Sequence, residues 1–521
     1  MTAHVSLVTH LSTRIHHFHA HLIPFRCYHG STTSTRKVSY SRETSIDLSP
    51  FTSILSVSPT TLLATVEPNV SMAALVRATL PLGLVPAVVP EFTTITVGGC
   101  FAGTGGESSS FRHGVFDDTV VGVEMVLGDG EVVRASATEN ADLWRGAAGS
   151  YGSLGVVTLL EVRLVRAERF VEVEYVPVRG AEEAVEAMKS VEGRGEVGFL
   201  DGILFGEGRG VVMLGRWEGG KQGEEGVGFT RRGDEWFYMH AEKVMKGLLK
   251  EEGKGRGGRV SRDSASTTSE GEKRTVRTHK ELIPTYDYLF RYDRACFWMG
   301  QHALDYFYVH NIRFSRWLGD SFLRPAKMMH AGQKAGLMNQ YVVQDISVPY
   351  QHVEELVSYI QKEIGIYPLW LCPLLLKHEW PLKPNDTSIP ERIMNIGMWG
   401  PGSKKLPKFV QQNRDLEEKT RQLHGLKCLY AQAFYTKEEF WKVYDKERYD
   451  TLRRKYKAET LPTVYDKVCK SSAIDEMEKR RKSSTERAKG VIKDFWICRG
   501  LYGAASSILG GDYLMTKAKA T

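Results

Sequence analysis

The stretch PEFTTITVGGCFAGTGGESSSFRHG, residues 90–114, decides the fold. Its glycines are closely spaced, at Gly98, Gly99, Gly103, Gly105 and Gly106. Glycine allows positive φ angles and lets the backbone approach a ligand, because no Cβ stands in the way. Free N–H groups in such a run suit a pyrophosphate, and Glu107, Ser108 and Ser109 add polar side chains. We therefore expect a phosphate-binding loop, with a glycine-rich surface turn as the alternative.

The residues that follow favour the phosphate-binding loop. TVVGVEMVLGDGEVVRAS, residues 119–136, predicts two strands joined by a tight turn at Gly128-Asp129-Gly130. Residues 140–165 predict a short helix, a second glycine loop and a strand. That loop, GSYGSLG at residues 149–155, either passes beside a cofactor or packs a strand closely against a helix. The first glycine stretch does not have the G-x-G-x-x-G spacing of a dinucleotide site between strand and helix.

The order of these motifs resembles the FAD-binding domain of flavoproteins of the vanillyl-alcohol-oxidase type, also called the PCMH type. More narrowly, the chain resembles the delta(24)-sterol reductases. Four further segments carry that narrower resemblance: MNQYVVQDISVP (338–349), IYPLWLCP (366–373), LYAQAFYTKEEFW (429–441) and LPTVYDKVCK (461–470). The resemblance covers most of residues 5–470.

The resemblance implies an α+β fold with two domains. Residues 1–166 would form the FAD-binding domain, and residues 167–470 a substrate domain that caps it with an antiparallel sheet. The last part of the second domain, residues 430–470, would pack back on the first. Residues 471–521 would form a charged tail with a peripheral membrane contact. Residues 250–280 are charged and poor in large apolar side chains, so we expect a disordered insertion there.

The cofactor that the resemblance implies is one FAD, and residues from three segments of the chain would bind it. The first is the hydroxyl-rich loop after residue 28, although this loop also suits an ordinary strand connection. Some relatives attach the flavin through a G-G-H histidine, whereas the order here is Tyr28-His29-Gly30, so we expect a non-covalent cofactor. The expected cofactor-binding residues are His29, Gly30, Ser31, Thr32, Ser34, Thr96, Val97, Gly98, Gly99, Gly103, Thr104, Gly105, Gly106, Glu107, Ser108, Ser109, Gly152, Gly155 and Val156.

The reaction implied by the resemblance is reduction of an isolated sterol side-chain double bond, with NADPH as a transient reductant. Such an alkene has no carbonyl to polarise it, so the reaction needs a general acid. Candidates are Tyr430, Tyr341, Asp345 and His113, each of which can also be read as a hydrogen-bonded core or loop residue. Two alternatives stay open: FAD-linked oxidation of another lipid, alcohol or secondary metabolite, and a flavoprotein fold that acts as a non-catalytic scaffold.

Composition excludes several other classes of protein. The 521 residues are 42% hydrophobic, which is enough for two sizeable cores, and the net charge of +7 is mild and dispersed. Nucleic acid is therefore a poor partner. The partner that the resemblance implies is an apolar, sterol-like molecule. Seven cysteines without a C-x-x-C pair argue against a zinc site or a disulfide framework and favour a reducing compartment. We expect no metal, and a location at the cytosolic face of the endoplasmic reticulum membrane or in the cytoplasm.

The first 42 residues can be read in two ways. They contain no acidic residue and several arginines, as mitochondrial transit peptides do. However, apolar residues recur with helical spacing at Val8, Leu11, Ile15, Phe18 and Leu22. We therefore favour a core-packing helix. Delta(24)-sterol reductases carry a hydrophobic anchor ahead of the equivalent helix, and we expect none in this sequence.

Aromatic residues alternate with arginines within residues 286–329. Phe314, Trp317, Leu318 and Phe322 would share one face of a helix. This segment predicts either an amphipathic element on a membrane surface, near the mouth of an apolar tunnel, or a core helix of the second domain.

Overall fold

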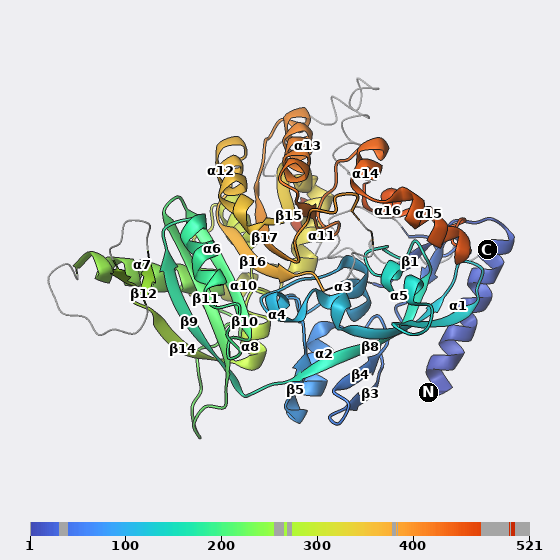
Figure 1. Ribbon diagram of the computed structural model, residues 1–521, viewed down its shortest axis with the longest axis horizontal. Helices are drawn as coiled ribbons and strands as arrows, with labels where there is room; N and C mark the ends of the chain where they lie inside the picture. Colours follow the sequence, from blue (N-terminus) through green and yellow to red (C-terminus); the bar gives the residue numbers. More distant parts are fainter. Residues whose placement is uncertain are drawn as a thin grey trace.

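The computed structural model describes residues 2–30, 40–254, 265–267, 273–377, 382, 384–469, 500 and 502–505. These residues form two domains packed side by side (Figure 1). The first domain holds the helix at the N-terminus and a six-stranded sheet, and the second is built on an eight-stranded sheet. The last helices of the second domain return to the first domain, on the right of Figure 1.

The sheet of the first domain has the strand order β3-β4-β8-β6-β7, with β5 pairing beside β4 on the long strand β8. A separate parallel pair, β1 and β2, lies near the N-terminal helix. The strands are β1 (Arg26–Tyr28), β2 (Ser45–Asp47), β3 (Ile54–Ser58), β4 (Leu63–Val66), β5 (Leu84–Pro86), β6 (Val120–Val126), β7 (Val132–Ser136) and β8 (Val156–Arg166). The helices are α1 (Thr2–Ala20), α2 (Met72–Thr79), η1 (Leu80–Leu82), α3 (Val97–Gly103), α4 (Ser110–His113), η2 (Phe116–Thr119) and α5 (Ala141–Ala147).

Several elements of this domain are as expected from the sequence. The hairpin over residues 119–136 is present as β6 and β7. The helix expected after Ser71 begins there, because the Ser71 side chain accepts a hydrogen bond from the Ala74 N–H, and Gly83 ends it with a φ of 68°. Helix α1 buries Val8, Leu11, Ile15 and Phe18. The apolar stripe ends earlier than expected, since Leu22 is exposed.

The glycine stretch at residues 90–114, where we expect a phosphate-binding loop, contains a helix. Residues 97–103 form helix α3, capped by the Thr96 side chain, and the positive φ in this stretch belongs to Thr104 rather than to a glycine. The N–H of Gly98 already donates to the Pro68 carbonyl, and that of Gly99 donates to Thr96 Oγ1. Gly98 is also needed for close packing, because a Cβ there would lie 2.7 Å from Pro68 Cβ.

The second domain is an antiparallel sheet with the order β14-β9-β11-β10-β16-β17-β15-β18. Its strands are β9 (Phe170–Val178), β10 (Phe199–Gly206), β11 (Arg209–Glu218), β14 (His279–Pro284), β15 (Tyr341–Pro349), β16 (Leu369–Leu375), β17 (Arg392–Pro401) and β18 (Leu426–Lys427). Val343 pairs with Trp399, and Gly397 pairs with both Asp345 and Trp370. Because side chains alternate along a strand, these five residues lie on one face of the sheet.

Helices α6 (Ala181–Lys189), α12 (Val353–Glu363) and α13 (Leu406–Gln422) cover the other face of this sheet (Figure 1). The remaining helices of the second domain are α7 (Phe237–Lys254), α8 (Thr285–Leu289), α9 (Met299–Tyr306), α10 (Arg313–Gly319), α11 (Pro325–Ala335), η4 (Leu337–Gln340), η5 (Tyr350–His352), α14 (Lys437–Val443), α15 (Lys446–Lys455) and α16 (Val464–Val468).

The segment expected to be disordered, residues 250–280, is regular at both ends. Helix α7 continues to Lys254, and β14 begins at His279. Between them, β12 (Ala265–Thr267) pairs with β13 (Lys273–Thr275). These parts complete or form regular elements, and disorder of the segment stays a prediction; its other residues lie outside the described ones.

The segment from α14 to α16 packs on the first domain. Lys457 Nζ contacts Asp129 Oδ2 at 2.8 Å, at the tip of the β6–β7 hairpin. The buried guanidinium of Arg453 donates to the carbonyls of Ser153, at 2.8 Å, and Leu461, at 2.7 Å. The tail expected at residues 471–521 lies outside the described residues except for residues 500 and 502–505. Nowhere in the described chain does a helix combine the length and the apolar character needed to cross a membrane.

We expect Arg453→Met to destabilise the protein by about 2–3 kcal/mol, because it leaves buried carbonyl groups without a donor. The measurement is the midpoint of thermal unfolding. Arg454→Met, on the exposed side of α15, is the matched control. Equal midpoints for the two variants would show that Arg453 does not hold the two domains together.

Candidate active site between the two domains

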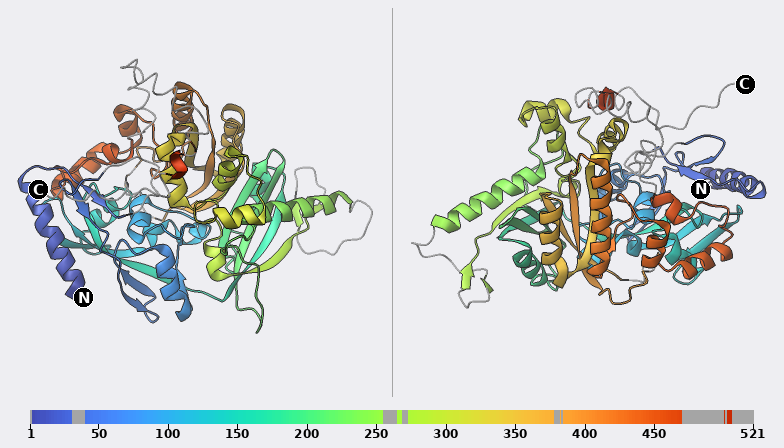
Figure 2. Two further views of the ribbon diagram at one scale, coloured as in Figure 1. Left: turned by 180° about the vertical axis from the view of Figure 1, so that it is seen from behind. Right: turned by 90° about the horizontal axis from the view of Figure 1, so that it is seen from above.

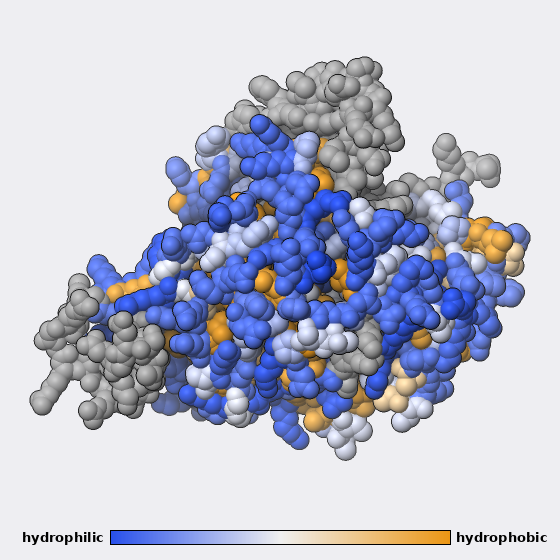
Figure 3. Space-filling view, turned by 45° about the horizontal axis from the view of Figure 1, so that its top comes forward, coloured by the Kyte–Doolittle hydropathy of each residue, from blue (hydrophilic) through white to orange (hydrophobic). Residues whose placement is uncertain are grey.

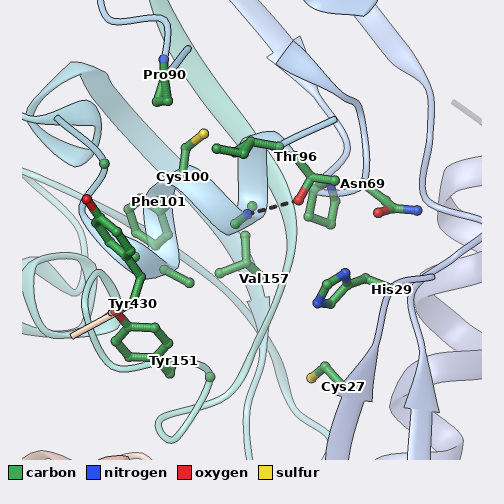
Figure 4. Close-up of a pocket in the computed structure, with 18 of the residues that line it drawn as sticks. Cys27, His29, Asn69, Pro90, Thr96, Cys100, Phe101, Tyr151, Val157 and Tyr430 are labelled. Atoms are coloured by element: carbon green, nitrogen blue, oxygen red, sulfur yellow. Dashed lines mark hydrogen bonds between the residues drawn. The ribbon is translucent and has the colours of Figure 1, made fainter. Parts of the chain in front are cut away.

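A cavity of about 390 Å³ lies between the two domains. The first domain contributes residues from β1, α3 and the start of β8, and the second contributes Phe297, Val343, Trp370, Trp399 and Tyr430. In Figure 4, Tyr430 and Tyr151 lie on one side of the cavity, and His29, Cys27 and Asn69 lie on the other. This size and mixture of apolar and polar walls are typical of a small-molecule site.

The structure brings most of the expected cofactor-binding residues to this one cavity. Those that line it are His29, Thr96, Gly98, Gly99, Gly103, Gly105, Gly106, Gly152, Gly155 and Val156. Gly103 faces open space, because the nearest atom to a Cβ built there is Tyr430 Cβ, at 3.8 Å. Ser31, Thr32 and Ser34 lie outside the described residues, and Gly30, Val97 and Thr104 are not among the lining residues.

Glu107, Ser108 and Ser109 do not line this cavity, contrary to expectation. The Ser108 and Ser109 hydroxyls both donate to the buried Glu107 carboxylate. Ser108 also accepts from Arg291 of the second domain, at 3.3 Å, and its carbonyl accepts from the Leu200 N–H. Ser108 therefore joins the two domains, while the Glu107 carboxylate and the Ser109 hydroxyl are engaged within the first domain.

One side of the cavity carries buried nitrogen atoms. Lys467 is buried, and its ammonium donates to the carbonyls of Tyr151, at 3.0 Å, and Gly152, at 2.8 Å. Burial lowers the pKa of Lys467 to about 8, so the group is still charged at neutral pH. Burial also lowers the pKa of His29, whose Nδ1 has no hydrogen-bond partner within the described residues. Both groups are placed to interact with an acceptor or an anion in the cavity.

A buried carboxyl group, Glu91, also lines the cavity. Burial raises its pKa well above the usual range, and the nearby Glu107 carboxylate adds to the shift. Burial therefore favours the protonated form of the Glu91 carboxyl. Its Oε1 has no hydrogen-bond partner in the part of the chain that the structure describes, so it offers a polar contact to whatever fills the cavity.

Tyr430 and Asp345, two of the expected general acids, are joined by a hydrogen bond. Asp345 is fully buried, and its Oδ1 accepts from Asn395 Nδ2 at 3.1 Å. Burial raises the pKa of Asp345 to about 7, although Asn395, Tyr430 and Lys427 act in the opposite direction. Burial also raises the pKa of Tyr430 well above its usual range, so the phenol holds its proton at the wall of the cavity.

The other two candidate acids lie elsewhere. Tyr341 shares a sheet face with Asp345, but its hydroxyl bonds His302 Nδ1 at 2.6 Å, and it does not line the cavity. His113 lines a separate cavity of about 190 Å³ together with Glu107 and Trp217. Burial, with help from nearby cations, lowers the pKa of His113 to about 4. Neither residue is placed to act on a ligand in the main cavity.

Aromatic rings form the second domain's part of the cavity wall. Phe297 stacks on Trp399 with ring centroids 4.3 Å apart, and on Tyr292 at 4.2 Å. Trp370 completes the group, at 5.3 Å from Phe297. Such a wall excludes water and suits a flat or apolar ligand.

Several residues at the site are not predicted from the sequence, among them Glu91, Asn69, Trp370 and Lys467. Lys467 lies in the segment LPTVYDKVCK and Trp370 in IYPLWLCP, both of which carry the family resemblance. A polar or aromatic residue within such a segment is the available signal. The resemblance implies that residues 430–470 pack on the first domain, but it does not single out Lys467, and nothing in the sequence places Trp370 there. Glu91 is the second residue of the glycine stretch, in which the glycines rather than this carboxyl carry the sequence-based prediction.

Comparison with known proteins agrees with this geometry. A family model described as an FAD binding domain matches residues 4–136. The delta(24)-sterol reductase of Homo sapiens is 29% identical over 422 residues, covering 80% of this chain and 76% of the human one. The enzyme of that name from Arabidopsis thaliana is 30% identical over 472 residues, with 83% and 78% covered, and that from Pisum sativum is 30% identical over 490, with 85% and 80% covered.

The chain belongs to the delta(24)-sterol reductase family. Its first domain is an FAD-binding domain of the PCMH type, and the two-domain α+β fold expected from the sequence is confirmed. As a member of this family with such a domain, the chain is an FAD-dependent oxidoreductase.

The residues around the cavity fit a flavin nucleotide. Such a cofactor combines an anionic diphosphate with a flat ring system that has donors and acceptors at its edge. The cavity offers the Arg26 and Lys467 cations, the open face of Gly103, and the unpaired polar atoms of His29 and Glu91. These residues of the family member would hold the cofactor in the first domain, facing the aromatic wall of the second.

We expect Gly103→Val to abolish retention of the flavin, because the new side chain would project into the cavity. The measurement is the ratio of flavin to protein absorbance after purification. Gly193→Val is the control, since a Cβ at Gly193 meets nothing within 4 Å. A Gly103→Val protein as yellow as the unmodified one would contradict this placement of the cofactor.

Proposed function

We propose that this chain reduces the isolated side-chain double bond of a sterol, with NADPH as the source of hydride. Addition of a hydride to the more substituted carbon and a proton to the less substituted one saturates the bond and balances the reaction. Bound FAD would supply the hydride and accept a new one from NADPH. The residues of the chain would then supply the proton and the binding surface.

The observation that carries this proposal is the hydrogen-bonded pair of Tyr430 and Asp345 at the wall of the cavity. Protonation of an alkene requires a group that keeps its proton until the hydride arrives. Tyr430 meets this requirement because burial keeps it neutral, and the neutral carboxyl of Asp345 can return a proton to the Tyr430 oxygen. Asn395 fixes the orientation of Asp345.

The aromatic wall supports an apolar substrate. Phe297, Trp370 and Trp399 present ring faces to the cavity, and a sterol side chain gains free energy when it leaves water for such a surface. A substrate of this kind resides in membranes. We therefore propose that the chain acts at the cytosolic face of the endoplasmic reticulum membrane, or in the cytoplasm next to a membrane.

The decisive experiment incubates the purified flavoprotein with NADPH and a sterol that carries the side-chain double bond, and follows the mass of the sterol. We expect a gain of two hydrogens. If NADPH bleaches the flavin but no sterol gains mass, the substrate is another molecule. If an alcohol or lipid bleaches the flavin and oxygen restores its colour, the chain is an oxidase. A protein without flavin absorbance would favour a scaffold.

We expect Tyr430→Phe to slow reduction of the alkene about 100-fold, because it removes the proton donor. Bleaching of the flavin by NADPH should be unchanged. The two half-reactions are measured separately by stopped-flow absorbance and by product mass. Tyr341→Phe is the matched control on the same sheet face. If Tyr430→Phe preserves both half-reactions, the acid lies elsewhere.

We expect the rate of alkene reduction to fall as pH rises through about 7, the pKa of Asp345. The ionised carboxylate raises the pKa of Tyr430 further and cannot return a proton to it, so Tyr430 becomes the weaker acid. Asp345→Asn cannot ionise and should remove this inflection from the pH profile of the single-turnover rate. An inflection that persists in Asp345→Asn would assign it to another group.

A further inference from the structure

A cluster of exposed apolar side chains surrounds helix α10. Of the eleven large apolar residues that are exposed in the described part of the chain, six lie within residues 308–318. We call them the α10 patch: Tyr308, Val309, Ile312, Phe314, Trp317 and Leu318. No residue of α10 is buried, and Phe314 and Leu318 are 64% and 62% exposed. The alternative of a core helix is therefore wrong for α10, and Phe322 lies beyond its end.

Helix α10 is oriented with its polar groups toward the protein and its apolar groups toward solvent. Arg316 Nε donates inward to the Asp234 carbonyl at 3.0 Å, and its Nη1 donates to Asn311 Oδ1 at 2.8 Å. Arg232 holds the other side, donating to the Trp317 carbonyl at 3.1 Å. A helix packed for stability alone would face the other way, because exposed apolar side chains lose the free energy of burial.

The charges carried by the patch segment itself are positive, although Asp234 and Glu235 of the neighbouring segment act on Arg316. Residues 306–319 contain Arg313 and Arg316 and no acidic residue, and the Arg232 guanidinium lies over the Trp317 ring at 4.9 Å. The nearest acids in sequence are already engaged: Asp305 accepts from Gln301, and Asp320 pairs with Arg294 and Arg324. An apolar surface with aromatic residues and a basic rim is complementary to an anionic bilayer surface.

The patch also adjoins the elements that wall the cavity. It lies in the connection between α9, which follows Phe297, and α11, which carries the cavity residue Met329. These helices, yellow-green, stand on the side of the molecule seen from behind in Figure 2. By contrast, the face shown in Figure 3 is mainly hydrophilic, with hydrophobic residues in small separate groups.

We propose that the α10 patch docks the chain on the surface of a bilayer that contains anionic lipid. Phe314, Trp317 and Leu318 enter the boundary between headgroups and acyl chains, while Arg313 and Arg232 contact lipid phosphates. This docking brings α9 and α11, and with them the aromatic wall of the cavity, to the membrane. It does not depend on the proposed reaction, because binding to lipid needs neither sterol nor NADPH.

The test is flotation of the full flavoprotein with vesicles of phosphatidylcholine, alone or with about 30% phosphatidylserine. We expect the protein to float with the anionic vesicles. The triple variant Phe314→Ser, Trp317→Ser, Leu318→Ser should bind the vesicles at least about tenfold more weakly. Arg313→Glu should weaken binding only to the anionic vesicles. The matched control, Leu82→Ser with Val132→Ser, changes exposed apolar residues of the first domain and should float like the unmodified chain.

Several outcomes would overturn the proposal. One is that the unmodified protein does not float, and another is that the triple variant floats as well as the control. If the unmodified chain forms a dimer and does not bind vesicles, and only the triple variant is a monomer, the patch would be assigned to a second copy of the chain. Residues 502–505 lie beside α11, where a Cβ on Gly503 would meet Ala331. Flotation gained only after truncation at residue 505 would therefore assign the patch to residues 506–521.

Retention of flavin separates loss of docking from loss of fold. All four variants should keep the flavin-to-protein ratio of the unmodified chain, because none changes a residue of the cavity. A triple variant that loses both flavin and vesicle binding would contradict the assignment of these side chains to the surface.

Discussion

One buried carboxylate, Asp201, holds the aromatic wall of the cavity together. It accepts hydrogen bonds from Arg291 at 3.1 Å, Tyr292 at 2.8 Å and Trp370 at 3.0 Å. Through Arg291 the same group reaches Ser108 in the glycine stretch of the other domain. A charge buried this deeply costs much free energy unless all its partners are in place. This network therefore helps to fix the position of the wall relative to the first domain.

Local sequence signals were enough for the first domain's framework. Ser71 and Gly83 mark both ends of a helix, and the Gly128–Gly130 turn joins two strands, because these structures depend on neighbouring residues. Helix α3 was missed for the opposite reason. Its glycines lower helix propensity, and one of them, Gly98, is required by contact with Pro68, thirty residues earlier.

At the site, the pairing of Tyr430 with Asp345 followed from two candidates that the sequence offered separately. Lys467 could not be placed in the same way. Its partners are the backbone carbonyls of Tyr151 and Gly152, which leave no trace in the sequence. The orientation of α10 was equally hidden, since an amphipathic pattern does not say which of its faces meets the protein.

The return of α15 and α16 to the first domain has a consequence for biosynthesis. Lys467, which lines the cavity, and Arg453, which packs on the first domain, are among the last described residues, three hundred or more positions after the segments they contact. During synthesis on the ribosome, the FAD-binding domain therefore stays incompletely packed until almost the whole chain has emerged. Only chains that reach this C-terminal segment would then bind the coenzyme. Prematurely terminated chains would lack flavin colour and would be cleaved more readily by proteases.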